Sequence, residues 1–261
     1  MKRLLPIFLF LFGCETFDVL TDNPLDPNNP DYELPNVSIL DLTDGQKLST
    51  DKIDVYLQGN ENVSEYSYKI KSSDSFVDMN DTWSIWSSSN VVSLEFLNEY
   101  SYELIVKSRY PTKRESNEVR LDFTVDAVKP GSLLLYPKQI QGNAFANSKL
   151  LLYAHELPKI SALEFIIEYD ESKMSFAANQ GSIEYGDVNV VRNNTNQIHY
   201  TIGKYGNNGF AQNALIAEIV FQMKDVSGSS SFIKILSPAA KSLDGQTIEI
   251  VGTNQTRVDV K

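Results

Sequence analysis

Two glutamates on one predicted strand form the pair of carboxylates whose spacing can be tested against catalytic chemistry. Glu164 and Glu168 lie four residues apart in a segment that alternates apolar and polar residues. Four residues of extended chain span about 13 Å, whereas the carboxyl groups of a glycosidase lie roughly 5 to 9.5 Å apart. The pair therefore fails as an acid–base couple within this strand, and a carboxylate from another strand stays open as a partner.

The other residues that could do chemistry lack the neighbours that they need. His155 is not followed by the second histidine of a zinc-binding helix, and Pro158 would break such a helix. His199 alternates with apolar neighbours, as a surface strand residue does. The sequence contains no Gly-x-Ser-x-Gly, no Lys-Ser/Thr after the glycines at 203–209, and no Asp-x-Asp-x-Asp-Gly calcium loop. We therefore expect a protein that is not an enzyme and that uses no metal and no cofactor.

Cys14 is the only cysteine of the chain, and its position favours lipid attachment. Two basic residues and a short apolar run precede it, which is the pattern of a secretory signal over residues 1–13. The apolar run is too short to span a bilayer of about 30 Å. Leu11-Phe12-Gly13-Cys14 resembles the bacterial lipobox, which implies acyl chains such as palmitate on Cys14 and a lipid anchor at the outer membrane or cell surface. The alternative is an ordinary cleaved signal with an incidental cysteine.

The segment after the cysteine is predicted to be an extended tether. Residues 14–35 carry four prolines among Asn and Asp, and such a composition cannot bury enough apolar surface to fold. The run Asn-Pro-Leu-Asp-Pro at 23–27 resembles the spacers of bacterial surface lipoproteins. A cation site formed by Asp22, Asp26 and Asp31 is the alternative, but a chain stiffened by proline cannot easily wrap an ion.

The composition predicts that most of the chain is folded. Of 261 residues, 42% are hydrophobic and 11% aromatic, which is enough for packed cores, and this length predicts about two domains. The net charge of −11 repels phosphate backbones, so we expect no nucleic-acid partner.

Residues 36–126 are predicted to form a first β-sandwich. Short strand signals alternate with polar turns such as Asp44-Gly45, and no helical period occurs. The tyrosine-rich segments at 66–68 and 100–104 resemble the immunoglobulin-like or fibronectin-type modules of bacterial surface proteins.

Two tryptophans in this domain leave two interpretations open. If exposed, Trp83 and Trp86 could stack on sugar rings and form a carbohydrate site. In a sandwich, however, a tryptophan is normally a core anchor, and residues three apart in a strand point to opposite faces. We expect packing in the core or at the edge.

A short linker at 127–131 is predicted to lead into a second β-sandwich over residues 132–261. A strand ending in Tyr169-Asp170 is followed by a Leu- and Ile-rich strand at 214–221, a Ser-Gly-Ser turn and a closing strand, and Asn193-Asn194 marks a further turn. This succession resembles the cohesin family. The resemblance implies a jelly-roll sandwich that binds a protein partner, dockerins above all.

Alternation along two of these strands predicts the binding residues. If Leu163, Phe165, Ile167 and Tyr169 face the core, Ile166 faces solvent between Glu164 and Glu168; by the same rule Ile216 and Val220 face out from the next long strand. If both strands share a sheet, the three aliphatic side chains form one apolar patch, which would mark a protein interface. The alternatives are a loop or the first domain covering them, or scattered single residues, which are normal.

Together these observations predict an exported, all-β lipoprotein with two sandwich domains, immunoglobulin-like and then cohesin-like. Its function would be to hold a protein partner, dockerin-like or another surface protein, at the cell surface. The alternative is a carbohydrate-binding surface lipoprotein for polysaccharide capture, which would need exposed, coplanar aromatic rings instead of an aliphatic patch.

Overall fold

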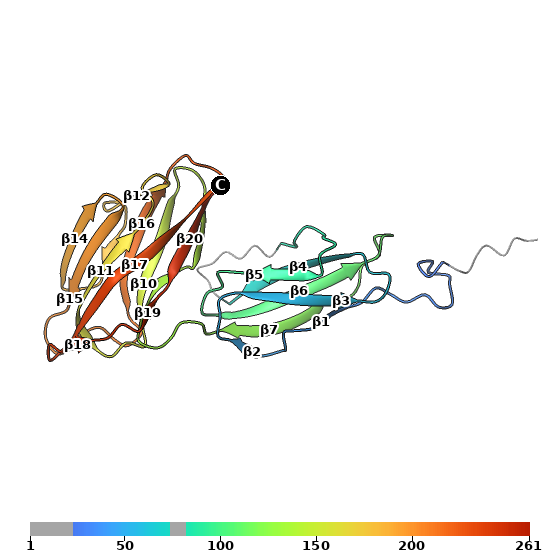
Figure 1. The fold of residues 1–261 in the computed structure, drawn as a ribbon, viewed down its shortest axis with the longest axis horizontal. Helices are drawn as coiled ribbons and strands as arrows, with labels where there is room; N and C mark the ends of the chain where they lie inside the picture. The colour runs from blue at the N-terminus through green and yellow to red at the C-terminus, as the bar shows by residue number, and fades with distance from the viewer. Residues whose placement is uncertain (1–22, 74–81) are drawn as a thin grey trace, which may run out of the picture.

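The computed structural model describes residues 23–73 and 82–261, and within them every regular element is a β-strand (Figure 1). The prediction of an all-β fold is confirmed. In the described part of the chain, no helix is long and apolar enough to cross a membrane. The predicted signal, Cys14 and the start of the tether lie outside the described residues.

The first sandwich consists of a three-stranded and a four-stranded sheet. The first has the order β1 (Val37–Ile39), β3 (Ile53–Gly59), β5 (Val91–Leu94); the second has the order β2 (Gln46–Leu48), β7 (Val119–Val125), β6 (Ser101–Arg109), β4 (Glu65–Ser72). Along β3, Val55 and Leu57 are buried while Asp54 and Tyr56 are exposed, so the strand has one core face. Tyr102 and Phe123 stack inside at a centroid distance of 5.3 Å.

The second sandwich consists of a six-stranded and a seven-stranded sheet. The first, here the β16 sheet, has the order β12 (Met174–Phe176), β16 (Leu215–Met223), β10 (Asn147–His155), β8 (Ser132–Tyr136), β19 (Gly252–Thr253), with β13 (Ile183–Glu184) also on β16. The second, here the β11 sheet, has the order β14 (Val188–Asn194), β15 (Gln197–Gly203), β11 (Ile160–Glu168), β17 (Ser229–Ser242), β20 (Gln255–Val260), β9 (Gln139–Gly142), with β18 (Thr247–Ile248) also on β17.

The core of the second sandwich lies between these two sheets. Phe165 of β11 stacks on Tyr200 of β15 at 4.9 Å between ring centroids, and both rings are fully buried. The chain also closes on itself here, because β19 and β20 pair in parallel with β8 and β9. Asn254 supports this closure. Its Oδ1 accepts from the N–H of Leu135 at 2.6 Å and its Nδ2 donates to the carbonyl of Leu135 at 2.7 Å, across 119 positions of sequence.

A buried ion pair joins the two sandwiches. Lys138 lies between β8 and β9, and its side chain is only 3% exposed. Its Nζ is 2.7 Å from Oε1 of Glu99 and 3.5 Å from Oδ2 of Asp51, both in the first sandwich. The N–H of Lys138 also donates to Oδ1 of Asn98 at 2.8 Å. A charged side chain this deeply buried requires such partners, so the junction has a fixed arrangement.

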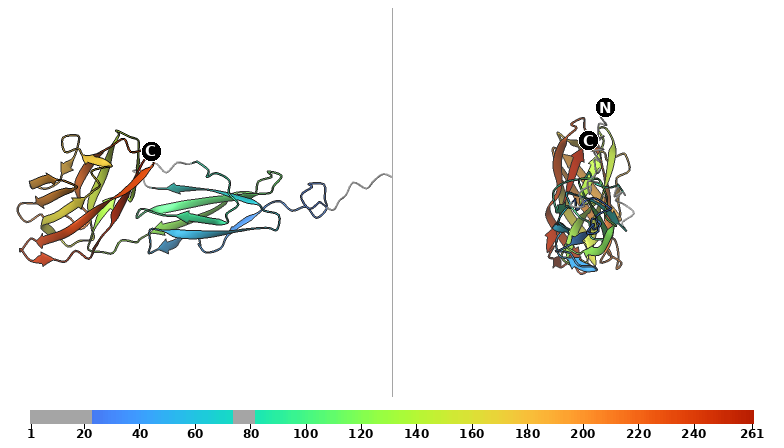
Figure 2. Two further views of the ribbon diagram at one scale, coloured as in Figure 1. Left: turned by 45° about the horizontal axis from the view of Figure 1, so that its top comes forward. Right: turned by 90° about the vertical axis from the view of Figure 1, so that its right-hand side faces the viewer.

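Aromatic rings also contact each other across the junction. The ring of Phe96, from the first sandwich, is 6.3 Å from that of Phe232 on β17, and the guanidinium of Arg257 lies 5.3 Å from the Phe96 ring. Tyr100 and Tyr136 lie 6.0 Å apart, again one from each sandwich. Figure 2 shows the result, an elongated molecule with the sandwiches end to end.

Candidate functional site

The structure places the predicted binding residues on two different sheets. Ile166 belongs to β11, whereas Ile216 and Val220 belong to β16, on the other side of the core. Along β11 the alternation is as predicted, because Ile166 is partly exposed between Glu164 and Glu168 while Phe165 is buried. The prediction of one patch formed by three aliphatic residues is wrong.

Ile216 is fully buried, at 0% exposure, because a bulge interrupts the alternation of β16. In the pairing with β10, Leu152 lies opposite Ala217 but the next residue, Tyr153, lies opposite Leu215. Ile216 is therefore the extra residue of the bulge, and it packs in the core cluster together with Ala217. A side chain in this position cannot contact a partner.

Val220 is covered from outside the β16 sheet and is 5% exposed. The loop between β12 and β13 lies against it, because a Cβ added to Gly181 would be 4.0 Å from Cγ2 of Val220. The N–H of Ala177 donates to the carbonyl of Val220 at 2.9 Å, and the N–H of Val220 donates to Oγ of Ser182 at 3.0 Å. A loop over this residue was one of the alternatives left open by the sequence.

The outer face of the β11 sheet is where the candidate site lies. Three rows of side chains cross it in register from β14 to β17: first Val190, Thr201, Glu164 and Ala239; then Arg192, His199, Ile166 and Leu236; then Asn194, Gln197, Glu168 and Lys234. Ile166 and Leu236 are half-buried at the centre, and charged side chains of both signs surround them. An aliphatic centre with a polar rim is the composition of a protein interface.

Part of this face was missed from the sequence. Asn193 and Asn194 were predicted as a turn, but they end strand β14, and the turn lies at residues 195–196, where Asn196 has a φ of 59°. The three valines at 188, 190 and 191 were the available signal for a strand. Asparagine tolerates the left-handed conformation, so Asn196 also marked the hairpin.

At β17, the outer face of the β11 sheet borders on the first sandwich. A cavity of about 550 Å³ lies there, lined by Lys234 and Leu236 of β17 and by Lys52 and Phe96 of the first sandwich, among others. A partner that covers Leu236 would therefore come close to the first sandwich.

Trp83 and Trp86 are half-buried, and their rings lie over cationic side chains on the outer face of the four-stranded sheet. The Nζ of Lys107 lies 4.4 Å from the centroid of Trp83 and 5.2 Å from that of Trp86, and the Arg109 guanidinium lies 4.2 Å from Trp86. Both rings thus lie over one face of β6, contrary to the expectation of opposite faces, because their segment is not a regular strand. Arg109 and Lys113 in turn lower the pKa of Glu65 to about 2 through hydrogen bonds.

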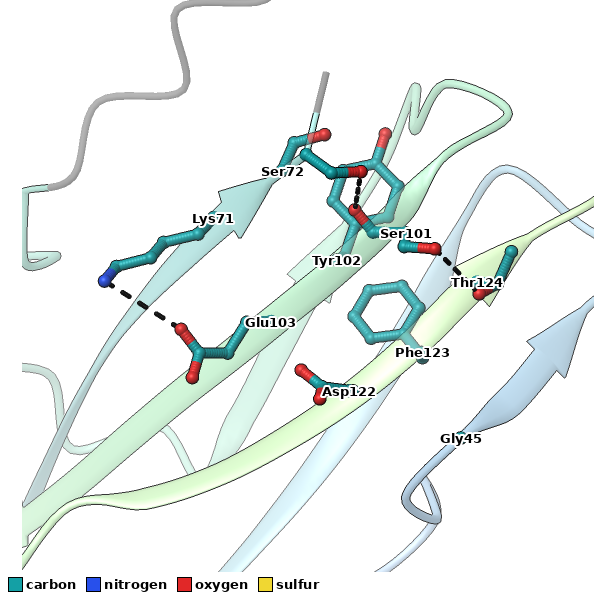
Figure 3. A pocket seen from close by; sticks show the side chains of 10 residues that line it. Gly45, Lys71, Ser72, Ser101, Tyr102, Glu103, Asp122, Phe123 and Thr124 are labelled. Carbon is teal, nitrogen blue, oxygen red and sulfur yellow. Dashed lines mark hydrogen bonds and ion pairs between the residues drawn. The ribbon is translucent and has the colours of Figure 1, made fainter. Parts of the chain in front are cut away.

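A cavity of about 410 Å³ on the first sandwich is lined by strands β4, β6 and β7 (Figure 3). Two pairs of its polar groups contact each other. Lys71 lies 3.9 Å from Glu103, and the hydroxyls of Ser101 and Thr124 are 3.2 Å apart. Its lining contains no histidine or cysteine. Among the residues that the structure describes, no group of three His, Cys, Asp or Glu side chains could hold a metal ion.

Among the comparisons with known proteins, only the one with solved structures finds similar proteins. No family model and no curated protein matches the chain. The sixth cohesin of scaffoldin B from Acetivibrio cellulolyticus, solved with a mutant Cel5 dockerin, is 14% identical, with 50% of this chain and 98% of that chain covered and a TM-score of 0.44. The CaCohA2 module of Clostridium acetobutylicum is 14% identical (51% and 93% covered, TM-score 0.43), and a non-cellulosomal cohesin of Archaeoglobus fulgidus is 11% identical (50% and 90% covered, TM-score 0.42).

Proposed function

We propose that the chain is a non-enzymatic recognition protein, and that its second sandwich holds a protein partner on the outer face of the β11 sheet. The observation that carries this proposal is the row through Ile166 and Leu236, an aliphatic centre flanked by Arg192, Lys234 and the two glutamates. Charged side chains at the rim would orient a partner, and the aliphatic centre would supply apolar burial. A dockerin-like module is the partner class that the sequence resemblance suggests.

Carbohydrate capture has less support. The two tryptophans that could have formed a sugar platform already lie over Lys107 and Arg109. The three rows on the outer face of the β11 sheet contain no Phe, Tyr or Trp side chain. Sugar binding would need coplanar, exposed rings at one place.

Ile166→Asp is expected to weaken partner binding tenfold or more and to leave the melting temperature nearly unchanged. The side chain is partly exposed, so folding tolerates the charge, whereas an interface would have to desolvate the carboxylate and would lose the apolar contact of the isoleucine. Proteins that co-purify with the wild type and with the variant should be compared by quantitative mass spectrometry, and the affinity of the captured protein measured by calorimetry. Ile85→Asp is the matched control, because Ile85 is 92% exposed on the first sandwich. Equal capture by all three proteins would refute the proposed face.

We further propose that Cys14 carries the lipid anchor of an exported surface lipoprotein. The lipobox-like run and the lone cysteine support this. The fold is compatible with such an anchor, since the start of the described chain, drawn in blue, and strand β14 lie at opposite ends of the molecule (Figure 1).

Cys14→Ser is expected to move the protein from the membrane fraction to the soluble fraction, because the acyl chains could no longer attach. Fractionation, with mass spectrometry of the mature N-terminus, measures this. An unmodified mature N-terminus in the wild type would contradict the lipid anchor.

A further inference from the structure

Strand β14 is an open edge of the second sandwich. It pairs with β15 and with no other described strand, and six of its seven residues are exposed. Figure 2 shows it at the tip of the molecule, away from the junction with the first sandwich. An edge strand presents unpaired N–H and C=O groups along its length, so it is a template for another strand.

This edge has little of the protection that edges usually carry. The pairing of β14 with β15 is continuous over all seven residues, without a bulge, and the strand contains neither proline nor lysine. Arg192 is its one charged residue. The opposite edge of the same sheet differs, since β9 has four residues and begins directly after the buried Lys138. Natural sheets blunt exposed edges with charge, proline or bulges, and β14 relies on a single arginine.

The sequence of β14 is complementary to itself. If two copies pair antiparallel about a dyad at Val191, all seven residues find a partner. Val190 then lies opposite Arg192 of the second copy, Asn189 opposite Asn193, and Val188 opposite Asn194, so no like charges face each other directly. Val191 is partly buried against the core of its own sandwich. In the dimer it would lie on the two-fold axis and contact Val191 of the second copy, so the apolar cores of the two sandwiches would be joined.

We propose that β14 pairs with β14 of a second copy of this chain and so forms a symmetric dimer. The β11 sheet extends from β14 toward the junction with the first sandwich. The two-fold axis of the dimer passes between the two paired β14 strands, so the two sheets extend in opposite directions from it. The two molecules therefore join at the ends that carry β14, and their first sandwiches lie at opposite ends of the dimer (Figure 1). One strand pair buries less surface than a standard stable interface, so the dimer is weak in solution, with a micromolar or larger Kd. This inference uses the chain alone and does not rest on the proposed function.

The test exploits the contact between Val190 and Arg192 across the dyad. A soluble form that begins at Glu15 keeps both sandwiches, and its self-association is measured by sedimentation equilibrium over a wide concentration range. Val190→Lys places a positive charge opposite Arg192 and should weaken the dimer, whereas Val190→Glu creates an ion pair and should strengthen it. Each contact occurs twice in a symmetric dimer, so a change of about 2-fold to 30-fold in Kd is expected.

A charge swap provides the internal control. Val190→Lys combined with Arg192→Glu restores opposite charges across the dyad and should restore the dimer. Val190 is exposed, so circular dichroism melts of all variants should coincide with that of the wild type. A wild type that stays monomeric at millimolar concentration overturns the proposal, as does a dimer that responds to Val190→Lys and Val190→Glu in the same way or not at all.

Discussion

Ile216→Asp is expected to unfold the second sandwich, whereas Ile166→Asp leaves it folded. Ile216 is 0% exposed and packs between the two sheets of that sandwich. An aspartate there loses about 1.5–3 kcal/mol of apolar transfer energy and also buries a carboxyl group without a partner, so the total cost exceeds about 4 kcal/mol. That is comparable with the whole stability of a small domain, about 5–15 kcal/mol.

Urea unfolding followed by circular dichroism measures this difference. Ile216→Val is the matched control, since removing one buried methylene should cost only about 0.5–1.5 kcal/mol. If Ile216→Asp unfolded at the same urea concentration as the wild type, the bulge would not turn this side chain into the core. The comparison with Ile166→Asp matters because sequence alternation predicts the same exposed environment for both residues.

The second large effect is expected at the junction. Glu99→Ala removes the nearest counterion of Lys138 and leaves its ammonium buried, 3.5 Å from Asp51. Breaking a buried pair from one side costs about 3–5 kcal/mol, and here that cost can be avoided if the sandwiches separate and water reaches Lys138. Small-angle X-ray scattering should show a broader range of interdomain distances, while each sandwich stays folded.

An exposed ion pair of the same length supplies the control. Lys107 and Glu115 also lie 2.7 Å apart, but the Glu115 side chain is 44% exposed, against 13% for Glu99. Glu115→Ala should therefore cost less than about 1 kcal/mol. The double variant Lys138→Met with Glu99→Leu should restore a closed junction, because apolar side chains can replace a buried ion pair. If Glu99→Ala and Glu115→Ala gave the same scattering, the buried pair would not fix the domains.

The faces of single strands could be predicted from the sequence, because they depend on local alternation. Along β11, Phe165 and Ile167 are buried and Glu164 is exposed, as their spacing requires. In β16 the same rule failed at Ile216, since all of its neighbours are apolar and a bulge leaves no mark in such a run. Which sheet a strand joins is set by pairing with distant segments, so β11 and β16 could not be separated in advance.

The junction could not be predicted for a different reason. A lone lysine in a sequence is normally a surface residue, and nothing near Lys138 indicates that Glu99 and Asp51 will surround it. The partners come from another domain, about forty positions away in the case of Glu99. Trp83 and Trp86 show the same limit, since Lys107 and Arg109, which lie over their rings, belong to β6, a strand about twenty positions further along the chain.

The closure of the second sandwich by its own last strands sets the order in which it can fold. β8 and β9 are made first, yet their parallel partners are β19 and β20, the last two strands of this sandwich. The nascent domain thus waits for its last residues before either sheet is complete, and Asn254 can bridge Leu135 only then. Contacts so distant in sequence form slowly, whereas the first sandwich is complete at β7 and can form before the second half of the chain is made.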